Sequence, residues 1–413
     1  MAKYCAKMIF FHFLYMTKIC YLCFFKERNI YMLILEKPYV SDMLINMAVS
    51  KQLPILYNAM SEQLKNQGHS LNLQNDALFE QSYRQKGRMY TMSENALEWI
   101  YKHFPESELT EKISLLKDKA AFRRLCRHLY PDFYFQELSL EELYAFPTAG
   151  LKLPLVIKPS VGFLSAGVYV IQNQQEWDNA LTDIKNNFEN VSRQFPDFVV
   201  GSHRFLLEEY IHGDEFAVDV YFDEEKKPVI LNIFHHRFAS DNDVSDRLYC
   251  TSKSIYDQYF NKFYDFLVSI NTELGLHDFP MHIEFRYNGK MAIPIEINPM
   301  RFAGFCLNEL QAHISGLHPV AAYLDNIHPD YEKMWAGKEN DVFSFLVFER
   351  PADLPAAARL DEEKLKAAFS HVLELRPVKV SVGVLATMFS QTDRQHLLEL
   401  DQALILDMHR FVK

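Results

Sequence analysis

The sequence predicts a protein of more than one domain, in the α/β and α+β classes. Three patterns support this prediction. A strand–helix–strand pattern follows residue 31, a hairpin of alternating polarity spans His282–Arg301, and further strand–helix–strand segments follow residue 328. The length of 413 residues also exceeds one ordinary domain and fits two or three.

The composition is that of a folded, soluble protein, with 49% hydrophobic and 23% charged residues. A formal net charge of −11 argues against nucleic acid or an anionic membrane as the main partner. Cys126, Cys250 and Cys306 are scattered, as reduced thiols in a cytosolic protein would be. We therefore expect a cytoplasmic protein that does not bind nucleic acid.

Residues 1–31 are apolar but do not have the pattern of a membrane span. The stretch from Met8 to Phe25 contains His12 and Lys18 and is shorter than the ~20 residues that a spanning helix needs. A lysine near the middle of such a helix costs roughly 2.5–3.5 kcal/mol. No small-residue cleavage site follows. We expect an upstream extension, with the first domain starting near Met32; a weak membrane anchor is the alternative.

The first domain, residues 32–115, is expected to be Rossmann-like. Met32–Leu35 has the pattern of a buried strand, Ser41 can cap a helix that runs to about Lys51, and Pro54–Tyr57 has the pattern of a second strand. The glycine-rich turn that binds dinucleotides is missing from this unit. Further helices are expected from Ser93, over 113–118 and from Lys119.

A loop rich in glycine and serine separates two strands in the middle of the chain. Leu153–Lys158 is the first strand, Pro159–Gly167 the loop and Val168–Ile171 the second strand. A P-loop would need a helix after Gly-Lys-Ser/Thr, so this loop is instead expected to be flexible and to cover phosphates.

The remaining elements follow from periodicity. We expect a helix around Trp177, strands at Phe205–Tyr210, Phe216–Phe222 and Pro228–Phe234, a polar mobile lid over His235–Cys250, and an amphipathic helix over Phe260–Leu274. Residues 329–413 are expected to form a separate C-terminal α+β unit, with a strand at Val342–Phe348, a helix at Glu362–Phe369 and a strand at Val378–Thr387.

The hairpin at 282–301 places acidic residues on one face and apolar residues, including Ile293, on the other. An odd-numbered loop such as 288–290 keeps Glu284 and Glu296 on the same face, because directly opposed residues share a face. Glu284 would then oppose Pro294, with Glu296 one diagonal step away, roughly 7–8 Å. Pro294 lacks a backbone donor, so its strand is expected to be bulged or locally unpaired there.

Two carboxylates and the amide oxygen of Asn298 are hard ligands on this acidic face, suited to Mg²⁺ that bridges phosphates. The alternative is a solvated outer face without function, because half-exposed antiparallel sheets carry similar patterns.

Four motifs in order give the central region a family resemblance. They are Lys119 at a helix start, VIKP at Val156–Pro159, LLEEYIHGDEFAVD at Leu206–Asp219, and HIEFR through PIEINPMR at His282–Arg301. The chain from about Lys119 to Asn308 resembles the ATP-grasp superfamily, and within it the carboxylate–amine ligases. The resemblance implies an ATP-grasp domain of two α+β lobes at 116–328, after a pre-ATP-grasp domain.

The resemblance also implies roles for single residues. Lys119 and Lys158 would hold phosphates under the loop that contains Gly162, Ser165 and Gly167. The hinge at Glu208, Glu209 and Ile211 would read adenine through backbone groups of Glu209 and Ile211, and Glu215 would bind ribose. Glu284, Glu296 and Asn298 match Mg²⁺ ligands, and Arg301 matches an arginine that contacts phosphate or substrate charge; its alternative is a structural pair with Glu309 or a nearby acid. Which of His235, His236 and Arg237 faces the phosphates stays open.

The function that the resemblance implies is ATP-dependent ligation of a carboxylate to an amine through an acyl phosphate. Its cofactors would be ATP and Mg²⁺, two ions rather than one, with Mn²⁺ as an alternative metal. Its partners would be the small carboxylate and amine substrates, and an oligomer is possible. The alternatives are a kinase-like phosphotransferase and a nucleotide-binding protein without catalysis.

Overall fold

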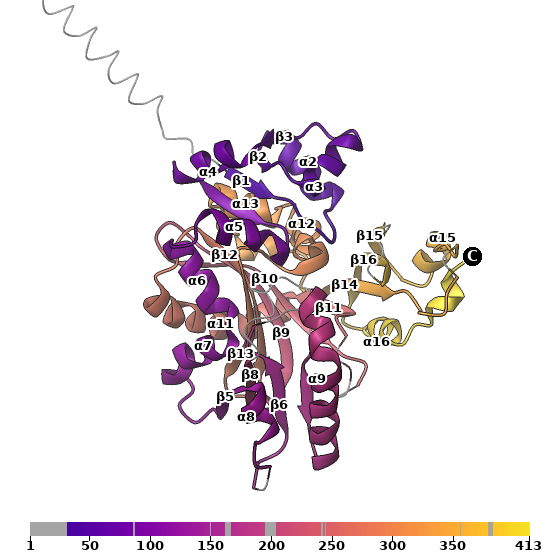
Figure 1. Cartoon of the computed structure of the whole chain (residues 1–413). Helices are drawn as coiled ribbons and strands as arrows, with labels where there is room; N and C mark the ends of the chain where they lie inside the picture. Colours follow the sequence, from indigo (N-terminus) through magenta and orange to yellow (C-terminus); the bar gives the residue numbers. More distant parts are fainter. Residues whose placement is uncertain are drawn as a thin grey trace, which may run out of the picture.

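The structure is a computed structural model that describes residues 31–85, 87–148, 150–161, 167–194, 204–240, 243, 245–355, 357–378 and 383–413, with only the backbone for 187–194. Its strands form three sheets (Figure 1). Within these ranges, no helix combines the length and the apolar character needed to cross a membrane.

The N-terminal sheet is parallel, with strand order β3-β2-β1-β4. Its strands are β1 (Tyr31–Ile34), β2 (Pro54–Leu56), β3 (Asn72–Gln74) and β4 (Arg88–Thr91). The helices are α2 (Asp42–Ser50), α3 (Ala59–Asn66), α4 (Asp76–Arg84), η1 (Glu94–Ala96) and α5 (Leu97–His103). The expected strand–helix–strand opening is confirmed, and the Ser41 side chain caps α2 by accepting from Leu44 N.

A second, antiparallel sheet of four strands forms a small lobe, at the bottom of Figure 1. Its order is β5 (Phe135–Ser139), β8 (Arg204–Glu209), β6 (Leu155–Pro159), β7 (Tyr169–Ile171). Trp177 and Ile184 of α9 (Gln174–Gln194) and Leu143 of α8 (Leu140–Tyr144) pack on this sheet. The helices α6 (Glu108–Lys117) and α7 (Lys119–Leu125), followed by η2 (Cys126–His128), lead into it.

The largest sheet has eight antiparallel strands in the order β13-β12-β9-β10-β11-β14-β16-β15. The first five are β13 (Ala292–Pro299), β12 (Phe279–Tyr287), β9 (Asp214–Phe222), β10 (Pro228–Arg237) and β11 (Leu248–Ser252). The long helix α11 (Lys253–Leu274) covers one face, where Phe263 and Leu267 join Phe216 and Phe285 in the main core. The opposite face of β9, β12 and β13 therefore remains for polar side chains.

The lid expected over 235–250 is shorter than predicted. Residues 235–237 continue β10 and residues 248–250 begin β11, because the two strands pair from His235–Cys250 to Arg237–Leu248. Residues 241, 242 and 244 of the connection lie outside the described residues, so the structure does not test its predicted mobility.

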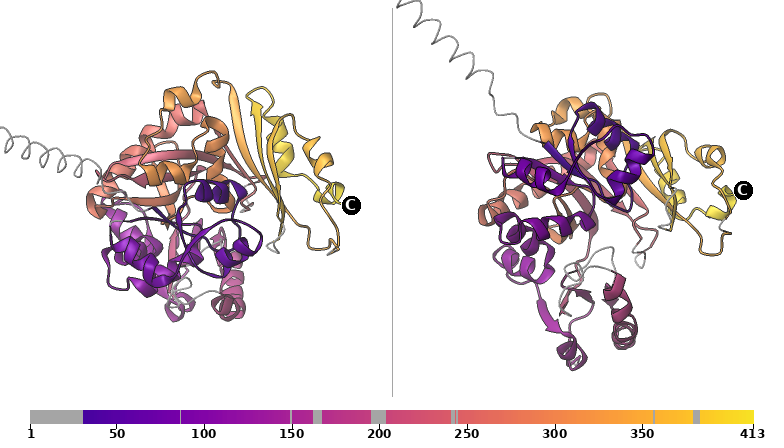
Figure 2. Two further views of the ribbon diagram at one scale, coloured as in Figure 1. Left: turned by 90° about the horizontal axis from the view of Figure 1, so that it is seen from above. Right: turned by 45° about the horizontal axis from the view of Figure 1, so that its top comes forward.

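The C-terminal segment continues the large sheet. β14 (Asp341–Glu349) pairs with β11 and is followed in the sheet by β16 (Val384–Asp393) and the edge strand β15 (Val372–Pro377). The helices α15 (Glu362–Lys366), α16 (Leu398–Leu404) and η4 (Met408–Phe411) share a core with it, which contains Leu365, Leu400 and Phe411. This segment, yellow in Figure 2, lies at one side of the molecule.

The connection between the two parts of the sheet contains η3 (Gly304–Glu309), α12 (Leu310–Ser315), α13 (Pro319–Asp325) and α14 (Tyr331–Trp335). Three residues in and before η3 have a positive φ without being glycine, namely Met300, Phe305 and Cys306. Such backbone is costly and persists where its surroundings enforce it. The strained segment directly follows the acidic strand β13.

Candidate functional site

The hairpin β12–β13 brings the two predicted metal-binding carboxylates directly opposite each other. Glu284 pairs with Glu296, while Phe285 pairs with Pro294, so Ile295 is an extra, bulged residue. The expected bulge at Pro294 is confirmed. The expected pairing of Glu284 with Pro294 is wrong, because the connection 288–291 has four residues and the bulge supplies the missing change of parity.

The bulge also moves Ile293 to the other face of the sheet. Ile293 opposes Arg286 and is buried with Phe133 and Ile211 in a small apolar cluster outside the main core. Uninterrupted alternation had placed Ile293 with the core residues. Only the proline next to it signalled that the alternation breaks.

Two lysines lie against the acidic face. Asp118 ends α6 and caps α7, so Lys117 and Lys119 flank a single capping residue. Lys119 Nζ lies 3.3 Å from Glu296 Oε1, and Lys117 Nζ lies 3.4 Å from Asn298 Oδ1 and pairs with Glu94. The sequence analysis missed Lys117 and Glu94, although the position of Lys117 beside the predicted cap was a usable signal.

The charges around the two carboxylates separate their pKa values. Burial acts to raise the pKa of Glu296, but the charges of Lys119 and Lys117 outweigh it and lower that pKa. Burial, together with the charge of Glu296, raises the pKa of Glu284. Burial also lowers the pKa of Lys117 to about 7, against the attraction of Glu296.

The donor set on this face suits a hard divalent cation. Two carboxylates and an amide oxygen are oxygen ligands of the kind that Mg²⁺ uses together with phosphates. Among the described residues, no group of three or more His, Cys, Asp and Glu side chains could hold a metal ion. An ion at Glu284, Glu296 and Asn298 would therefore need further ligands from a nucleotide or water.

A second cluster of cations surrounds Glu208. Lys158 Nζ lies 2.6 Å and Arg123 Nε 2.7 Å from its carboxylate oxygens, and all three side chains are buried. Burial opposes ionisation, but Arg123 and Lys158 lower the pKa of Glu208 to about 2. The Glu208 side chain thus holds Lys158 in the small lobe, a contact that the sequence did not predict.

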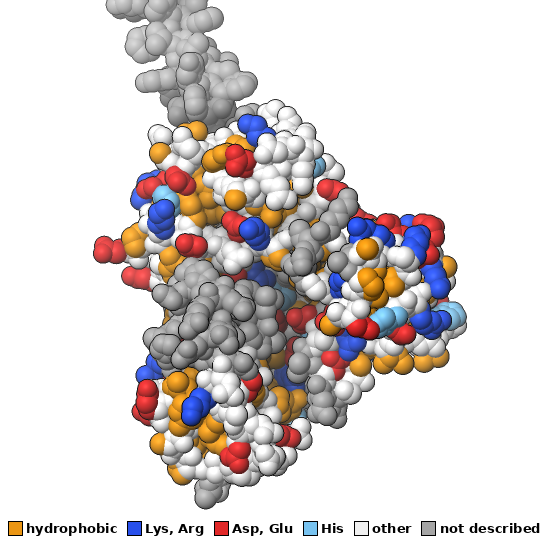
Figure 3. Space-filling model, turned by 45° about the vertical axis from the view of Figure 1, so that its right-hand side comes forward, with side chains coloured by type: hydrophobic (Ala, Val, Ile, Leu, Met, Phe, Trp, Pro, Cys, Tyr) orange, Lys and Arg blue, Asp and Glu red, His pale blue; other side chains and the backbone are white. Residues whose placement is uncertain are grey.

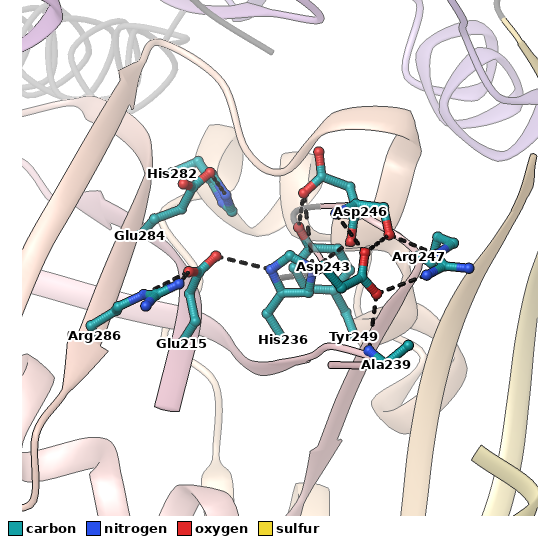
Figure 4. Close-up of polar contacts among 11 residues, drawn as sticks. Glu215, His236, Ala239, Asp243, Asp246, Arg247, Tyr249, His282, Glu284 and Arg286 are labelled. Carbon is teal, nitrogen blue, oxygen red and sulfur yellow. Dashed lines mark hydrogen bonds and ion pairs between the residues drawn. The ribbon is translucent and has the colours of Figure 1, made fainter. Parts of the chain in front are cut away.

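Glu215 lies between a histidine and an arginine (Figure 4). Its carboxylate is 2.9 Å from His236 Nδ1 and 3.0 Å from Arg286 Nε. Arg286 also donates to Ile211 O and lies over the Tyr210 ring, so it joins β12 to the predicted hinge. Burial raises the pKa of Glu215, but His236 and Arg286 outweigh it and lower that pKa.

The three basic residues at the end of β10 point to different places. His236 is on the face of Glu215 and stacks on Tyr249. His235 stacks on Phe216, a residue of the main core. Arg237 pairs with Asp401 of the C-terminal segment. Of the three, His236 thus lies beside the predicted ribose position.

Arg301 follows the strained Met300, whose φ is 64°. Arg301 Nη1 donates to Phe302 O at 3.0 Å, and Nη2 lies 3.9 Å from Glu94 Oε2. Of the alternative partners, Glu309 pairs with Arg376 instead, and Glu94 is the acid that lies near Arg301.

The phosphate-covering loop is only partly described. Gly162 and Ser165 lie outside the described residues. Gly167 has a φ of 75°, and a Cβ there would come within 3.3 Å of Pro159 Cγ, so the loop returns close to the end of β6. The predicted hinge lies within the described residues. Glu209 N donates to Tyr134 O, and Ile211 is buried beside Phe133. Figure 3 shows acidic, basic and histidine side chains in the hollow between the small lobe and the C-terminal segment.

The comparisons with known proteins concern the fold of this chain. Residues 151–309 match the model of a family described as an ATP-grasp domain. No curated protein matches the sequence significantly. Among solved structures, an L-amino acid ligase from Bacillus licheniformis is similar over 94% of this chain and 98% of its own, with a TM-score of 0.64 and 14% identity.

Two further solved structures have the same fold. An N5-carboxyaminoimidazole ribonucleotide synthetase from Thermotoga maritima has a TM-score of 0.62 at 13% identity, over 93% of this chain and 98% of its own. A biotin carboxylase from Campylobacter jejuni, in a β,γ-ATP complex, has a TM-score of 0.60 at 11% identity, over 88% and 87%. At these identities the likeness establishes the fold alone.

Proposed function

We propose that this chain, whose residues 151–309 belong to the ATP-grasp family, is an ATP- and Mg²⁺-dependent ligase that joins a carboxylate to an amine or similar nucleophile. The observation that carries the proposal is the direct opposition of Glu284 and Glu296 on a face lined by Lys117 and Lys119, with Lys158 near enough for its charge to help lower the pKa of Glu296. Acidic ligands and phosphate-binding cations in one place are what phosphoryl transfer requires. We assign this site to a domain at 116–328, with a pre-ATP-grasp domain at 32–115 and an appended unit at 329–413.

The base and ribose of ATP would lie between the two lobes. The cluster of Phe133, Ile211 and Ile293 offers an apolar surface for adenine. The carbonyl oxygen of Glu209 and the N–H of Ile211 would read its edge, while Glu215 would accept from the ribose hydroxyls, held in place by His236 and Arg286. Lys119 and Lys158 would hold phosphates under the loop that ends at Gly167.

Glu284, Glu296 and Asn298 would hold Mg²⁺, with two ions as the preferred number and Mn²⁺ as a possible substitute. When bound, the metal would neutralise phosphate charge and orient the phosphate oxygens. Lys117 and Lys119, which contact these ligands here, would place their positive charges beside the phosphates that the metal binds.

The residues of the chain mainly have to align reactants and stabilise charge. A substrate carboxylate oxygen attacks the γ-phosphorus while the bond to the β–γ bridging oxygen breaks, which gives an acyl phosphate and ADP. The amine then attacks the acyl carbon, phosphate leaves, and the amine loses a proton. Arg301 follows β13, the strand that carries Glu296 and Asn298. Its planar guanidinium group would orient the substrate carboxylate or hold the transferred phosphoryl group through two parallel hydrogen bonds.

A phosphate-release screen tests the proposal. Mg-ATP would be incubated with arrays of amino acids and small carboxylic acids, amino acids first because the similar structures include an L-amino acid ligase. The expected products are ADP, phosphate and an amide. A phosphorylated acceptor without free phosphate would favour the kinase-like alternative, and ATP binding without turnover on any substrate would favour a nucleotide-binding protein.

A pair of variants tests the metal assignment. Glu284→Ala with Glu296→Ala should abolish Mg²⁺-dependent turnover while the thermal midpoint stays near that of the wild type. Glu224→Ala with Glu225→Ala, in the exposed turn between β9 and β10, makes the same change of charge away from the site and should leave turnover unchanged. Normal turnover in the first variant would overturn the assignment.

A further inference from the structure

Asp219 lies at the centre of β9, under the acidic face, and is completely buried. Its two neighbours in the sheet are Asn232 on β10 and His282 on β12. Oδ1 accepts from His282 Nδ1 at 2.9 Å and from Ala303 N at 2.8 Å, and Oδ2 accepts from Asn232 Nδ2 at 3.0 Å. All three donors therefore converge on one carboxylate that the solvent does not reach.

Two of these contacts lead to predicted site residues. The other ring nitrogen of His282, Nε2, lies 3.6 Å from Glu284 Oε1, so Asp219 sets the orientation of the ring beside a predicted metal ligand (Figure 4 shows His282 and Glu284). Ala303 lies two residues after Arg301, in the turn whose Met300 has a left-handed φ. A hydrogen bond to Ala303 N thus helps to enforce the strained turn that carries Arg301.

We propose that Asp219 is a positioning residue that fixes Glu284 and Arg301 relative to each other. Through His282 it aligns one predicted metal ligand, and through Ala303 N it aligns the turn that presents the arginine. The proposal rests on the proposed function, because it assumes that Glu284 binds a metal ion. Neighbours of metal ligands commonly control affinity by orienting the ligands, and their loss costs about 10–100-fold.

Another buried aspartate, directly after the same strand, has no such contacts and provides a matched control. Asp223 is also almost fully buried, but its Oδ1 accepts from Glu225 N and Lys227 N in the turn between β9 and β10. Asp223→Asn should therefore lower stability without changing the metal site.

Asp219→Asn changes the contacts with little change in volume. If the new amide keeps its oxygen toward His282 and Ala303, its NH₂ faces the NH₂ of Asn232. Asn232 cannot rotate without losing its second bond, to Asn308 O at 3.2 Å. The substitution thus breaks at least one of the hydrogen bonds that Asp219 accepts, whichever way the new amide turns.

The test measures metal binding rather than turnover. Mn²⁺ is titrated into the full-length protein saturated with ADP, with free Mn²⁺ followed by electron paramagnetic resonance, and metal-free ADP binding is measured by calorimetry. Asp219→Asn should weaken Mn²⁺ binding by about 10-fold or more, with metal-free ADP binding nearly unchanged. Asp223→Asn should lower the thermal midpoint and bind Mn²⁺ as the wild type does.

A second variant keeps the proposal testable if Asp219→Asn does not fold. In His282→Asn the amide nitrogen takes the place of Nδ1, which keeps a donor to Asp219 but removes the Nε2 end that faces Glu284. It should fold and show a similar loss of Mn²⁺ affinity. Wild-type Mn²⁺ affinity in either folded variant would overturn the proposal, whereas a wild-type protein that binds no Mn²⁺-ADP would overturn the proposed function itself.

Discussion

Arg376 Nη1 lies 2.6 Å from Glu309 Oε2, and both side chains are almost completely buried. Ser41, the cap of α2, donates to the other oxygen of Glu309, and Arg376 makes two further bonds to Glu374. The start of α2, the strained segment after β13 and the edge strand β15 therefore meet at one carboxylate. The C-terminal unit is thus joined to the site segment by a buried ion pair as well as by the sheet.

Removing one partner of this pair should strongly destabilise the protein. Arg376→Met leaves Glu309 buried without its cation, and we expect a loss of about 3–5 kcal/mol in the free energy of unfolding. The double variant Arg376→Met with Glu309→Gln should lose less than the sum of the single losses. Urea unfolding measures both values. Lys366→Met, which removes an exposed pair with Glu363, should cost much less, because solvent screens such a pair. An equally small loss in Arg376→Met would show that the buried pair contributes little.

Arg301→Lys should not behave as a conservative substitution. Lysine keeps the positive charge but lacks the planar guanidinium group, whose Nη1 donates to Phe302 O. Once a substrate is known, we expect kcat to fall by a factor on the order of 10²–10³, as after loss of one preorganised donor. Steady-state kinetics separates this from a change in KM alone, which would indicate simple docking of the carboxylate. Arg84→Lys, on the exposed face of α4, is the matched control and should retain both constants.

Glu208 should contribute to the loss of stability in acid. Because its pKa falls from 4.5 in the unfolded chain to about 2 in the folded protein, its contribution is present above pH 4.5 and is lost as the pH falls toward 2. By pH 4, about 1 kcal/mol of that contribution should be gone. Glu208→Gln lowers stability at every pH, but the difference in unfolding free energy between pH 7 and pH 4 should be smaller than in the wild type. An unchanged difference would contradict the lowered pKa.

Local patterns predicted much of the fold and site. Ser41 as a cap, the opening strand–helix–strand unit and the acidic face of the hairpin all follow from neighbouring residues, because capping and alternation act over a few positions. Contacts between distant segments could not be predicted in this way. Nothing near Arg376 points to Glu309, and nothing near β11 indicates that β14 pairs with it.

The position of Ile293 shows the same limit at short range. Alternation assigns each residue of a strand to a face only while the ladder is regular, and one inserted residue exchanges the faces for all that follow. Pro294 signalled an irregularity, but the number of residues in the turn had to be known before its effect on Glu284 and Glu296 could be predicted. The apolar cluster of Ile293 with Phe133 and Ile211 was missed for this reason.

The bulge at Ile295 has a consequence for how this hairpin tolerates insertions and deletions. On the site side of the bulge, Glu284, Glu296 and Asn298 pair with their partners independently of the residues at 288–291. Natural variants can therefore lengthen the tip or recruit it for other contacts without redirecting the carboxylates, provided that the strand pairs next to the bulge persist. Loss of the single residue Ile295 would leave Pro294 opposite Phe285 and Glu296 opposite Glu284 in a regular ladder, so both carboxylates would keep their face and only the local bend would be lost. In related sequences, length variation at the tip and loss of the bulged residue are thus both compatible with the same carboxylate face.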